Sequence, residues 1–144
     1  MAIALQVAKR ASMHGDVPIG AVVLDAHGEL CAQGGNEKEL TGDPTAHAEL
    51  LALRQAAVAL GGWRLSGCTL VTTLEPCTMC AGAAVQARIS RLVIGAWDEK
   101  AGAVSSLWDV VRDPRLNHRI EVISQVKAEM CTKLLQDYFA SQRA

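Results

Sequence analysis

Aromatic residues are scarce in this chain. Its 144 residues include three Trp, one Tyr and one Phe, about 3% of the total. Proteins that bind single-stranded nucleic acid regardless of its sequence use aromatic platforms on which successive bases stack. The composition argues against such a platform, so any base that the chain binds must be held mostly by shape and by hydrogen bonds.

The chain also lacks a long apolar run and a strong charge of one sign. No run approaches the roughly 20 residues that cross a bilayer, and the first residues do not resemble a signal peptide. We therefore expect a cytoplasmic protein. The formal net charge is −1, without the positive excess typical of proteins that neutralise phosphates. Most positive charge comes late, since residues 51–144 carry eleven Lys and Arg and residues 1–50 only three.

Half of the residues are apolar. A chain of this length can bury one real core but not two comfortable ones, so a single domain over residues 1–144 is expected. The five cysteines are an odd number, and in a reducing compartment metal binding explains them better than disulfides. Cys31, Cys68 and Cys131 stand among apolar residues and are expected in the core. Cys77 and Cys80 form a C-x-x-C pair.

Apolar spacing along the chain predicts strands that alternate with helices. The predicted elements are a helix over 2–13, hairpin strands over 19–24 and 30–32, a helix over 50–60, a strand over 69–74, a helix opened by Pro76, strands over 91–94 and 120–123, and a helix over 126–139. Residues 107–118 are predicted to be an irregular surface segment. This order favours an α/β fold, a three-layer α/β/α sandwich whose mixed central sheet includes an antiparallel hairpin.

Two short segments carry the chemistry, with the patterns H-x-E at 47–49 and P-C-x-x-C at 76–80. Together they are the signature of zinc-dependent nucleobase deaminases. Cys77 and Cys80 are three residues apart, which places both sulfurs on one face of a helix, and Pro76 fits the first helical position. In the first turn, unpaired N–H groups and the helix dipole favour thiolate over thiol. Both cysteines are therefore predicted metal ligands.

His47 and Glu49 are two residues apart, about 200° around a helix axis, so they cannot share one side of a helix. A common target must lie beyond the helix end. Asp43 or Thr45 can cap this helix and Pro44 can occupy its first turn. We expect His47 to be the third metal ligand and Glu49 to remain free for proton transfer.

Three protein ligands leave one tetrahedral position open for water, which is typical of a catalytic zinc site. One Zn²⁺ per chain is therefore predicted. Zinc lowers the pKa of a bound water to around 7 and yields hydroxide at neutral pH. Glu49 would take the water's proton and deliver it to the ring nitrogen and then to the departing amine. The predicted reaction is hydrolytic deamination with loss of ammonia.

The flanking residues resemble the cytidine deaminase-like superfamily and, within it, the bacterial tRNA-specific adenosine deaminases. The resemblance extends over nearly the whole chain. It rests on the residues of segments 16–22, 35–36, 43–49, 53–56, 74–77, 79–83, 88–89, 91–93, 95–96 and 117–119, with Asp98 and Lys100. It implies the cytidine deaminase-like fold and conversion of adenosine to inosine at the wobble position of a tRNA anticodon.

The same resemblance implies substrate contacts. Asn36 would hydrogen-bond the flipped adenine, the Ala48 backbone would contact the base, and Asp98 would contact the ribose. The nearest candidates in sequence for contacts with phosphates of the anticodon loop are Lys100, Arg88 and Arg91. The resemblance further implies a homodimer, with the helix over 80–88 as the contact.

Other interpretations stay open at this stage. Asn36 can instead cap a loop, Asp98 can pair with Lys100 or cap a loop, and Glu75 is expected to bond the start of the following helix. The near-neutral charge and the lack of a basic C-terminal tail also suit a deaminase of a free base or nucleoside, such as guanine or cytosine. A third possibility is a non-enzymatic zinc or redox module built on the C-x-x-C, but this possibility gives Glu49 no role.

Overall fold

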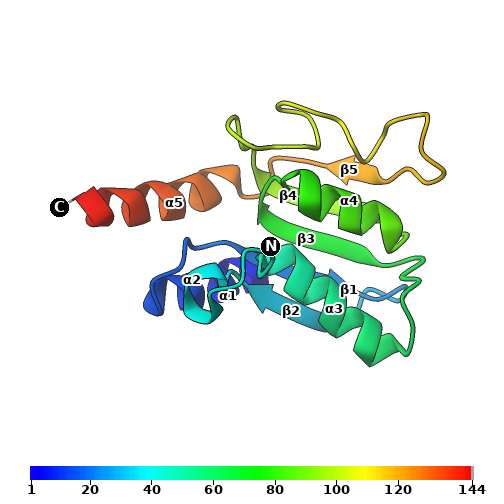
Figure 1. Cartoon of the computed structure of the whole chain (residues 1–144), viewed down its shortest axis with the longest axis horizontal. Helices are drawn as coiled ribbons and strands as arrows, with labels where there is room; N and C mark the ends of the chain where they lie inside the picture. Colours follow the sequence, from blue (N-terminus) through cyan, green and yellow to red (C-terminus); the bar gives the residue numbers. More distant parts are fainter. Residues whose placement is uncertain (144) are drawn as a thin grey trace.

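The computed structural model describes residues 1–143, which form a five-stranded sheet with helices on both faces (Figure 1). The strand order is β2-β1-β3-β4-β5. The strands are β1 (Gly20–Leu24), β2 (Leu30–Gly35), β3 (Thr69–Leu74), β4 (Arg91–Ala96) and β5 (Glu121–Ile123). The helices are α1 (Ala2–Met13), α2 (Lys38–Thr41), α3 (Ala48–Leu60), α4 (Thr78–Gln86) and α5 (Ala128–Arg143).

The sheet is mixed. β1 pairs antiparallel with both β2 and β3, whereas β3 pairs parallel with β4, and β4 pairs parallel with β5. A short turn suffices to join β1 to β2, while the parallel crossover from β3 to β4 needs a longer connection, which contains α4. The predicted α/β sandwich with a mixed central sheet is confirmed.

Successive side chains of β1 point into two different cores. Ala21 and Val23 pack in a cluster that includes residues of α3 and α4, whereas Val22 packs against Ala4 of α1. Cys131 of α5 lies in a further cluster that also contains a residue of α1. Thus α3 and α4 cover one face of the sheet, and α1 and α5 cover the other.

Gly34 of β2 allows α3 to lie very close to the sheet. A Cβ atom at this position would lie 2.6 Å from the Ala48 carbonyl oxygen and 2.8 Å from the Ala52 nitrogen, too close for any side chain. Ala48, Ala52 and Ala56 recur every four residues on the buried face of α3. This close packing fixes the start of α3, where His47 lies.

The predicted first residues of three helices were wrong. α3 begins at Ala48 rather than at residue 50, and α4 begins at Thr78. α5 begins at Ala128 rather than at residue 126 because Gln125 and Lys127 have φ values of 62° and 53°, outside the right-handed helical region. The four-residue helix α2 was not predicted, because it is too short to give a periodic pattern.

Residues 107–118 contain neither helix nor strand, as the sequence predicted. None of the helices within residues 1–143 is both long enough and apolar enough to span a membrane.

Candidate active site

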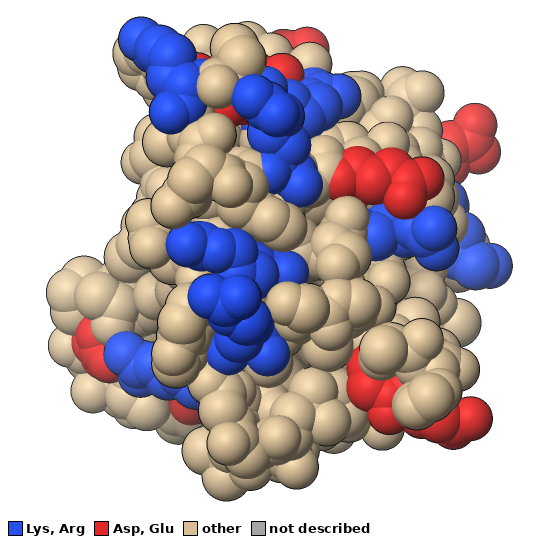
Figure 2. All heavy atoms as spheres, turned by 90° about the vertical axis from the view of Figure 1, so that its right-hand side faces the viewer, with Lys and Arg blue, Asp and Glu red and all other residues tan. Residues whose placement is uncertain are grey.

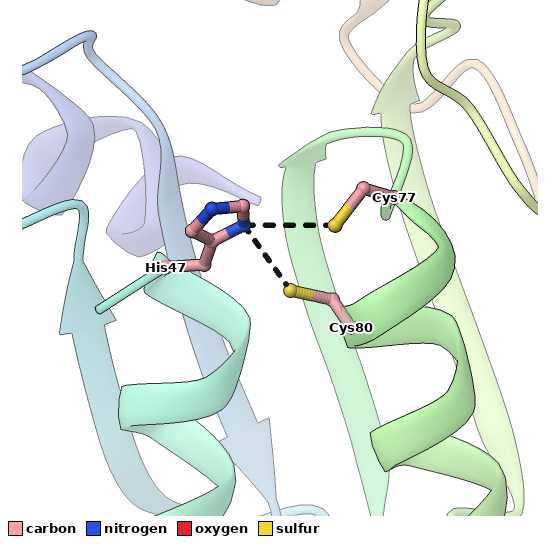
Figure 3. A group of neighbouring side chains, drawn as sticks. All are labelled: His47, Cys77 and Cys80. Carbon is pink, nitrogen blue, oxygen red and sulfur yellow. Dashed lines mark hydrogen bonds between the residues drawn. The ribbon is translucent and has the colours of Figure 1, made fainter. Parts of the chain in front are cut away.

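The site lies where α3 and α4 begin, because both helices start at the same edge of the sheet (Figure 1). His47 is the N-cap residue of α3 and Cys77 is the N-cap residue of α4, each with extended backbone angles. Cys80 follows within the first turn of α4, and all three side chains converge between the two helix ends (Figure 3). Two helix N-termini, each with unpaired N–H groups, therefore face one point.

The predicted capping arrangement was wrong in detail. Neither Asp43 nor Thr45 caps α3. Instead, the Asp43 carboxylate accepts hydrogen bonds from the Thr45 N–H at 2.8 Å and from its hydroxyl at 2.8 Å, within the turn that leads to His47. Pro76 precedes the N-cap residue of α4 and does not occupy the first helical position. The prolines thus mark the approach to each helix rather than its first turn.

The distances among the three side chains suit a tetrahedral zinc ion. The Nδ1 atom of His47 lies 3.6 Å from the Cys77 Sγ and 3.5 Å from the Cys80 Sγ. Around a tetrahedral zinc with Zn–N of about 2.0 Å and Zn–S of about 2.3 Å, such ligand atoms lie about 3.6 Å apart. All three ligand atoms lie within 4.8 Å of one another. The donor set of one imidazole and two thiols fits Zn²⁺ in both chemistry and spacing.

The protonation of the two thiols differs. A hydrogen bond from the Cys80 thiol, followed by the backbone N–H groups of Cys80 and Met79, lowers the pKa of Cys77 to about 5. The same shared hydrogen bond, together with burial, raises the pKa of Cys80. Cys77 is thus the more acidic of the two thiols, as expected for a thiol at a helix N-terminus.

Glu49 lies beside the three ligands without joining them. Within residues 1–143 the one group of ligand atoms close enough to share an ion consists of His47, Cys77 and Cys80. Glu49 is only 4% exposed, and burial raises its pKa to about 7. A carboxyl group with this pKa can both accept and donate a proton near neutral pH.

A small pocket of about 170 Å³ opens over this group. Its walls contain three of the predicted substrate contacts, Asn36, Ala48 and Asp98, together with Glu49. The remaining lining residues are Val17, Ile19, Lys38, His47, Glu75, Cys77 and Ala101. Residues from five separate segments of the chain therefore meet around one cavity beside the metal ligands.

Asn36 is 6% exposed and fixed by hydrogen bonds on both sides. Its amide nitrogen donates to the Val17 carbonyl at 3.4 Å, and its Oδ1 atom accepts from the Lys38 N–H at 3.1 Å. The loop-capping role that the sequence left open is thus present. It orients the Asn36 amide at the wall of the pocket.

Asp98 also caps a loop. Its Oδ1 atom accepts hydrogen bonds from the N–H groups of Lys100 at 3.0 Å and Ala101 at 3.3 Å. Lys100 itself does not line the pocket over the metal ligands. It lines a neighbouring cavity of about 380 Å³ together with Trp97, Phe139 and Arg143.

The structure places Arg88 and Arg91 far from the pocket. Arg88 follows the last turn of α4 and stacks over Trp63, with its guanidinium 5.8 Å from the ring centroid. Arg91 begins β4 and pairs with Glu121 at 3.1 Å. Figure 2 shows this end of the molecule, where several Lys and Arg side chains gather. The two arginines therefore do not line the pocket, and their contact with phosphates of an anticodon loop stays a prediction.

Glu75 has a role that the sequence did not predict. Its carboxylate accepts hydrogen bonds from four backbone N–H groups and one hydroxyl. The donors are the N–H groups of Asp98, Val104, Ser105 and Ser106, at 2.8 to 3.0 Å, and the Ser106 hydroxyl. Although burial alone raises the pKa of Glu75, these hydrogen bonds hold it below the ordinary value. Glu75 therefore folds residues 98–106 against the pocket and does not cap the helix that follows it.

The space around Glu75 shows how closely this loop fits. A side chain at Gly102 would collide with the Glu75 carboxyl group. A signal was present in the sequence, because a carboxylate at the end of an apolar strand with no nearby cation requires backbone N–H partners. The N–H groups that bind Glu75 could not be deduced, since they come from residues 23 to 31 positions later.

Comparisons with known proteins agree with this geometry. The family model of the cytidine and deoxycytidylate deaminase zinc-binding region matches residues 1–96. The tRNA-specific adenosine deaminase of Haemophilus influenzae is 45% identical over 143 residues, which cover 99% of this chain and 83% of that protein. Both the predicted family and the predicted zinc-binding domain are thereby confirmed.

Two solved structures help to place the chain within this fold. A structure from a study of A-to-I editing by tRNA:A34 deaminases at the wobble position superimposes with a TM-score of 0.90 and 43% identity, covering 94% of this chain and 97% of that one. A guanine deaminase from Nitrosomonas europaea gives a TM-score of 0.77 and 29% identity, with 96% and 82% covered. The chain belongs to the cytidine and deoxycytidylate deaminases and, among them, to the family of the tRNA-specific adenosine deaminases.

Proposed function

We infer that this protein is a zinc-dependent hydrolase that converts adenosine to inosine in tRNA, and we propose the wobble position of the anticodon as its target. One observation carries the inference. Three side chains that can hold zinc lie beside a buried Glu49, in a chain that is 45% identical to a tRNA-specific adenosine deaminase over nearly its full length. This combination favours adenosine in tRNA over a free base.

We propose that His47, Cys77 and Cys80 hold the zinc and that Glu49 moves the protons. Zinc held at this point supplies a Lewis acid that lowers the pKa of a bound water. Glu49 accepts one proton of the attacking water and donates it to the ring nitrogen; it then takes the second proton from the new hydroxyl group on the amino-bearing carbon and donates it to the leaving amine. Its burial excludes bulk water from these transfers. The products are inosine and ammonia.

We propose that Asn36, Ala48 and Asp98 hold the target nucleoside. Ala48 is the first residue of α3, so its N–H has no acceptor within the helix and can bond the base. The Asn36 amide is fixed at the pocket wall by its own hydrogen bonds. Asp98 uses Oδ1 for its loop, which leaves Oδ2 for a ribose hydroxyl.

Lys100 is proposed to contact the RNA outside the pocket. It lines the neighbouring cavity with Trp97 and Phe139, so a nucleotide beside the target can stack there while its phosphate meets the lysine. The base itself has to leave the anticodon stack to enter the small pocket over the metal ligands.

We further propose a cytoplasmic homodimer in which each chain is a single domain over residues 1–144. An apolar depression of about 540 Å³ lies between α3 and α4 and is lined by Leu50, Ala83, Ala87 and Trp63, among others. Trp63 is 59% exposed. A second copy that covers this surface would bury the exposed ring and would use the helix that the sequence indicated.

The substrate class is tested by ammonia release from an anticodon stem-loop with adenosine at the wobble position and from a panel of adenine, guanine, cytosine and their nucleosides. The proposal expects release from the stem-loop alone. Release from guanine or cytosine but not from the stem-loop would identify a free-base deaminase. A zinc-loaded protein that is inactive on every substrate would instead support a non-enzymatic module.

A further inference from the structure

Lys38 is the one Lys or Arg among the described residues that lines the pocket over the metal ligands. The other charged residues of this wall are the carboxylates of Glu49, Glu75 and Asp98. Lys38 has an exposed side chain at the start of α2, just after Asn36. A single cation thus stands at the mouth of an otherwise acidic cavity.

The backbone around Lys38 is held in place from the pocket side. The Lys38 N–H donates to the Asn36 Oδ1 atom at 3.1 Å, so the residue proposed to bind the base also positions the lysine. The neighbouring Glu37 N–H donates to the Ala46 carbonyl at 2.9 Å, directly before His47. Lys38 is therefore tied to both the base-binding and the metal-binding segments.

A buried aspartate fixes the far side of the same segment. Asp16 is 0% exposed, and its carboxylate accepts the N–H of Glu39 at 2.6 Å and the N–H of Leu40 at 3.1 Å. Its partner His14 lies 3.0 Å away. Although α2 has only four residues, it is anchored at both sides and presents Lys38 from a defined position.

Lys38 has no carboxylate partner within 4.0 Å in the part of the chain that the structure describes. Among the acids of the pocket wall, Glu75 accepts four backbone N–H groups and the Asp98 Oδ1 atom accepts two. The ammonium group is thus available to an anion brought by the substrate. A nucleobase and a ribose are neutral, so the anion nearest to them is the phosphate of the same nucleotide.

We propose that Lys38 is a specificity-determining residue that binds a phosphate flanking the target nucleoside and thereby favours a nucleotide within RNA over a free base or nucleoside. The proposal rests on the function inferred above, since it presumes an RNA substrate. A lysine reaches a phosphate as a mobile point charge and does not need a planar, bidentate geometry. Asn36 and Lys38, two residues apart in sequence, would then bind the base and the phosphate of one nucleotide.

The test compares wild type, Lys38→Ala and Lys38→Arg on two anticodon stem-loops. One stem-loop is unmodified. In the other, neutral methylphosphonates replace the two phosphates that flank the target adenosine. On the unmodified RNA we expect Lys38→Ala to raise KM about tenfold while kcat changes less than about twofold, because charge-assisted hydrogen bonds typically contribute at this level. Lys38→Arg should restore most of the loss.

The neutral stem-loop separates a phosphate contact from a structural effect. On it, wild type and Lys38→Ala should have the same KM, because the partner of the lysine is gone. The matched control is Lys9→Ala, which removes an equal charge from the exposed face of α1 and should behave as wild type on both RNAs. Zinc content and Tm should be unchanged in all variants.

Two outcomes would overturn the assignment of Lys38 alone. One is a Lys38→Ala variant with wild-type KM on the unmodified RNA, and the other is an equal loss on both RNAs. A wild-type enzyme that forms no inosine in the unmodified stem-loop would instead overturn the proposed function, and the role of Lys38 with it. The activity of wild type therefore distinguishes the two failures.

Discussion

His47 and Cys77 are equivalent residues of two neighbouring helices: each is the N-cap, and the His47 Nδ1 and Cys77 Sγ atoms lie 3.6 Å apart. The contact joins segments that are 30 residues apart in sequence. A metal ion between them therefore does more than catalyse, because it connects the starts of α3 and α4. The metal site should therefore affect both activity and stability.

Cys77→Ala should lose zinc and lower stability, because two remaining protein ligands cannot hold the ion against competing water and buffer ligands. The loss also separates the ends of two helices that the metal connects. Metal content by atomic absorption and Tm by calorimetry check this. Cys31→Ala, at a half-buried cysteine outside the site, is the matched control and should keep full zinc. Full zinc stoichiometry in Cys77→Ala would contradict the ligand assignment.

Glu49→Gln should keep zinc and lose activity. The amide preserves the shape of the buried side chain but cannot take a proton from water or return it. General acid–base groups typically contribute about 10²- to 10⁴-fold in rate, and a loss at the upper end is expected because Glu49 acts on both water and leaving amine. Inosine formation and metal content are measured on the same sample. A metal-free variant would show that Glu49 is a ligand.

The metal ligands and Glu49 could be predicted because their signal is local. H-x-E and C-x-x-C are short motifs, and their spacing indicates metal ligands without knowledge of how the rest of the chain folds. The start of α4 was placed too early because Pro76 lies before the N-cap residue, and the start of α3 was placed too late because the apolar spacing begins only at Leu50. Side-chain capping cannot be read from a proline alone.

Contacts between residues that are far apart in sequence could not be predicted, because they depend on how a loop folds back toward the pocket. Glu75 meets residues 98–106 only because the chain turns back after β4. Arg88 and Arg91 follow α4 in sequence, yet they lie at the end of that helix remote from the pocket. Their closeness in sequence to the metal ligands did not bring them to the pocket, because the length of α4 separates them from the N-terminal end that carries Cys77 and Cys80.

Glu75→Gln should loosen residues 98–106 without removing zinc. The amide is neutral and has a single acceptor oxygen, so several buried N–H groups lose their partner. A loss of about 2 to 3 kcal/mol in unfolding free energy is expected, since hydrogen bonds to a buried charge contribute at this level. Hydrogen exchange should become faster in residues 98–106, and KM should rise because Asp98 is no longer fixed. Unchanged exchange in this loop would contradict the role of Glu75.

Ala83→Glu should disrupt the proposed homodimer. It places a charge in the apolar depression between α3 and α4, and an unpaired charge buried in an interface costs several kcal/mol. Sedimentation at several protein concentrations should show a dimer for wild type and a monomer for the variant. Met13→Glu, at an 84% exposed residue on the opposite face, is the control and should remain dimeric. A wild type that sediments as a monomer would refute the dimer itself.

Glu49 and the zinc site are proposed to convert one adenosine of tRNA to inosine. This proposal is tested most directly by incubating unmodified tRNA that carries adenosine at the wobble position with zinc-loaded wild type and with Glu49→Gln, and then locating inosine by sequencing. Inosine is expected at the wobble position alone with wild type, and no inosine is expected with Glu49→Gln. An unchanged tRNA after incubation with zinc-loaded wild type, or equal editing by both proteins, would contradict the proposal.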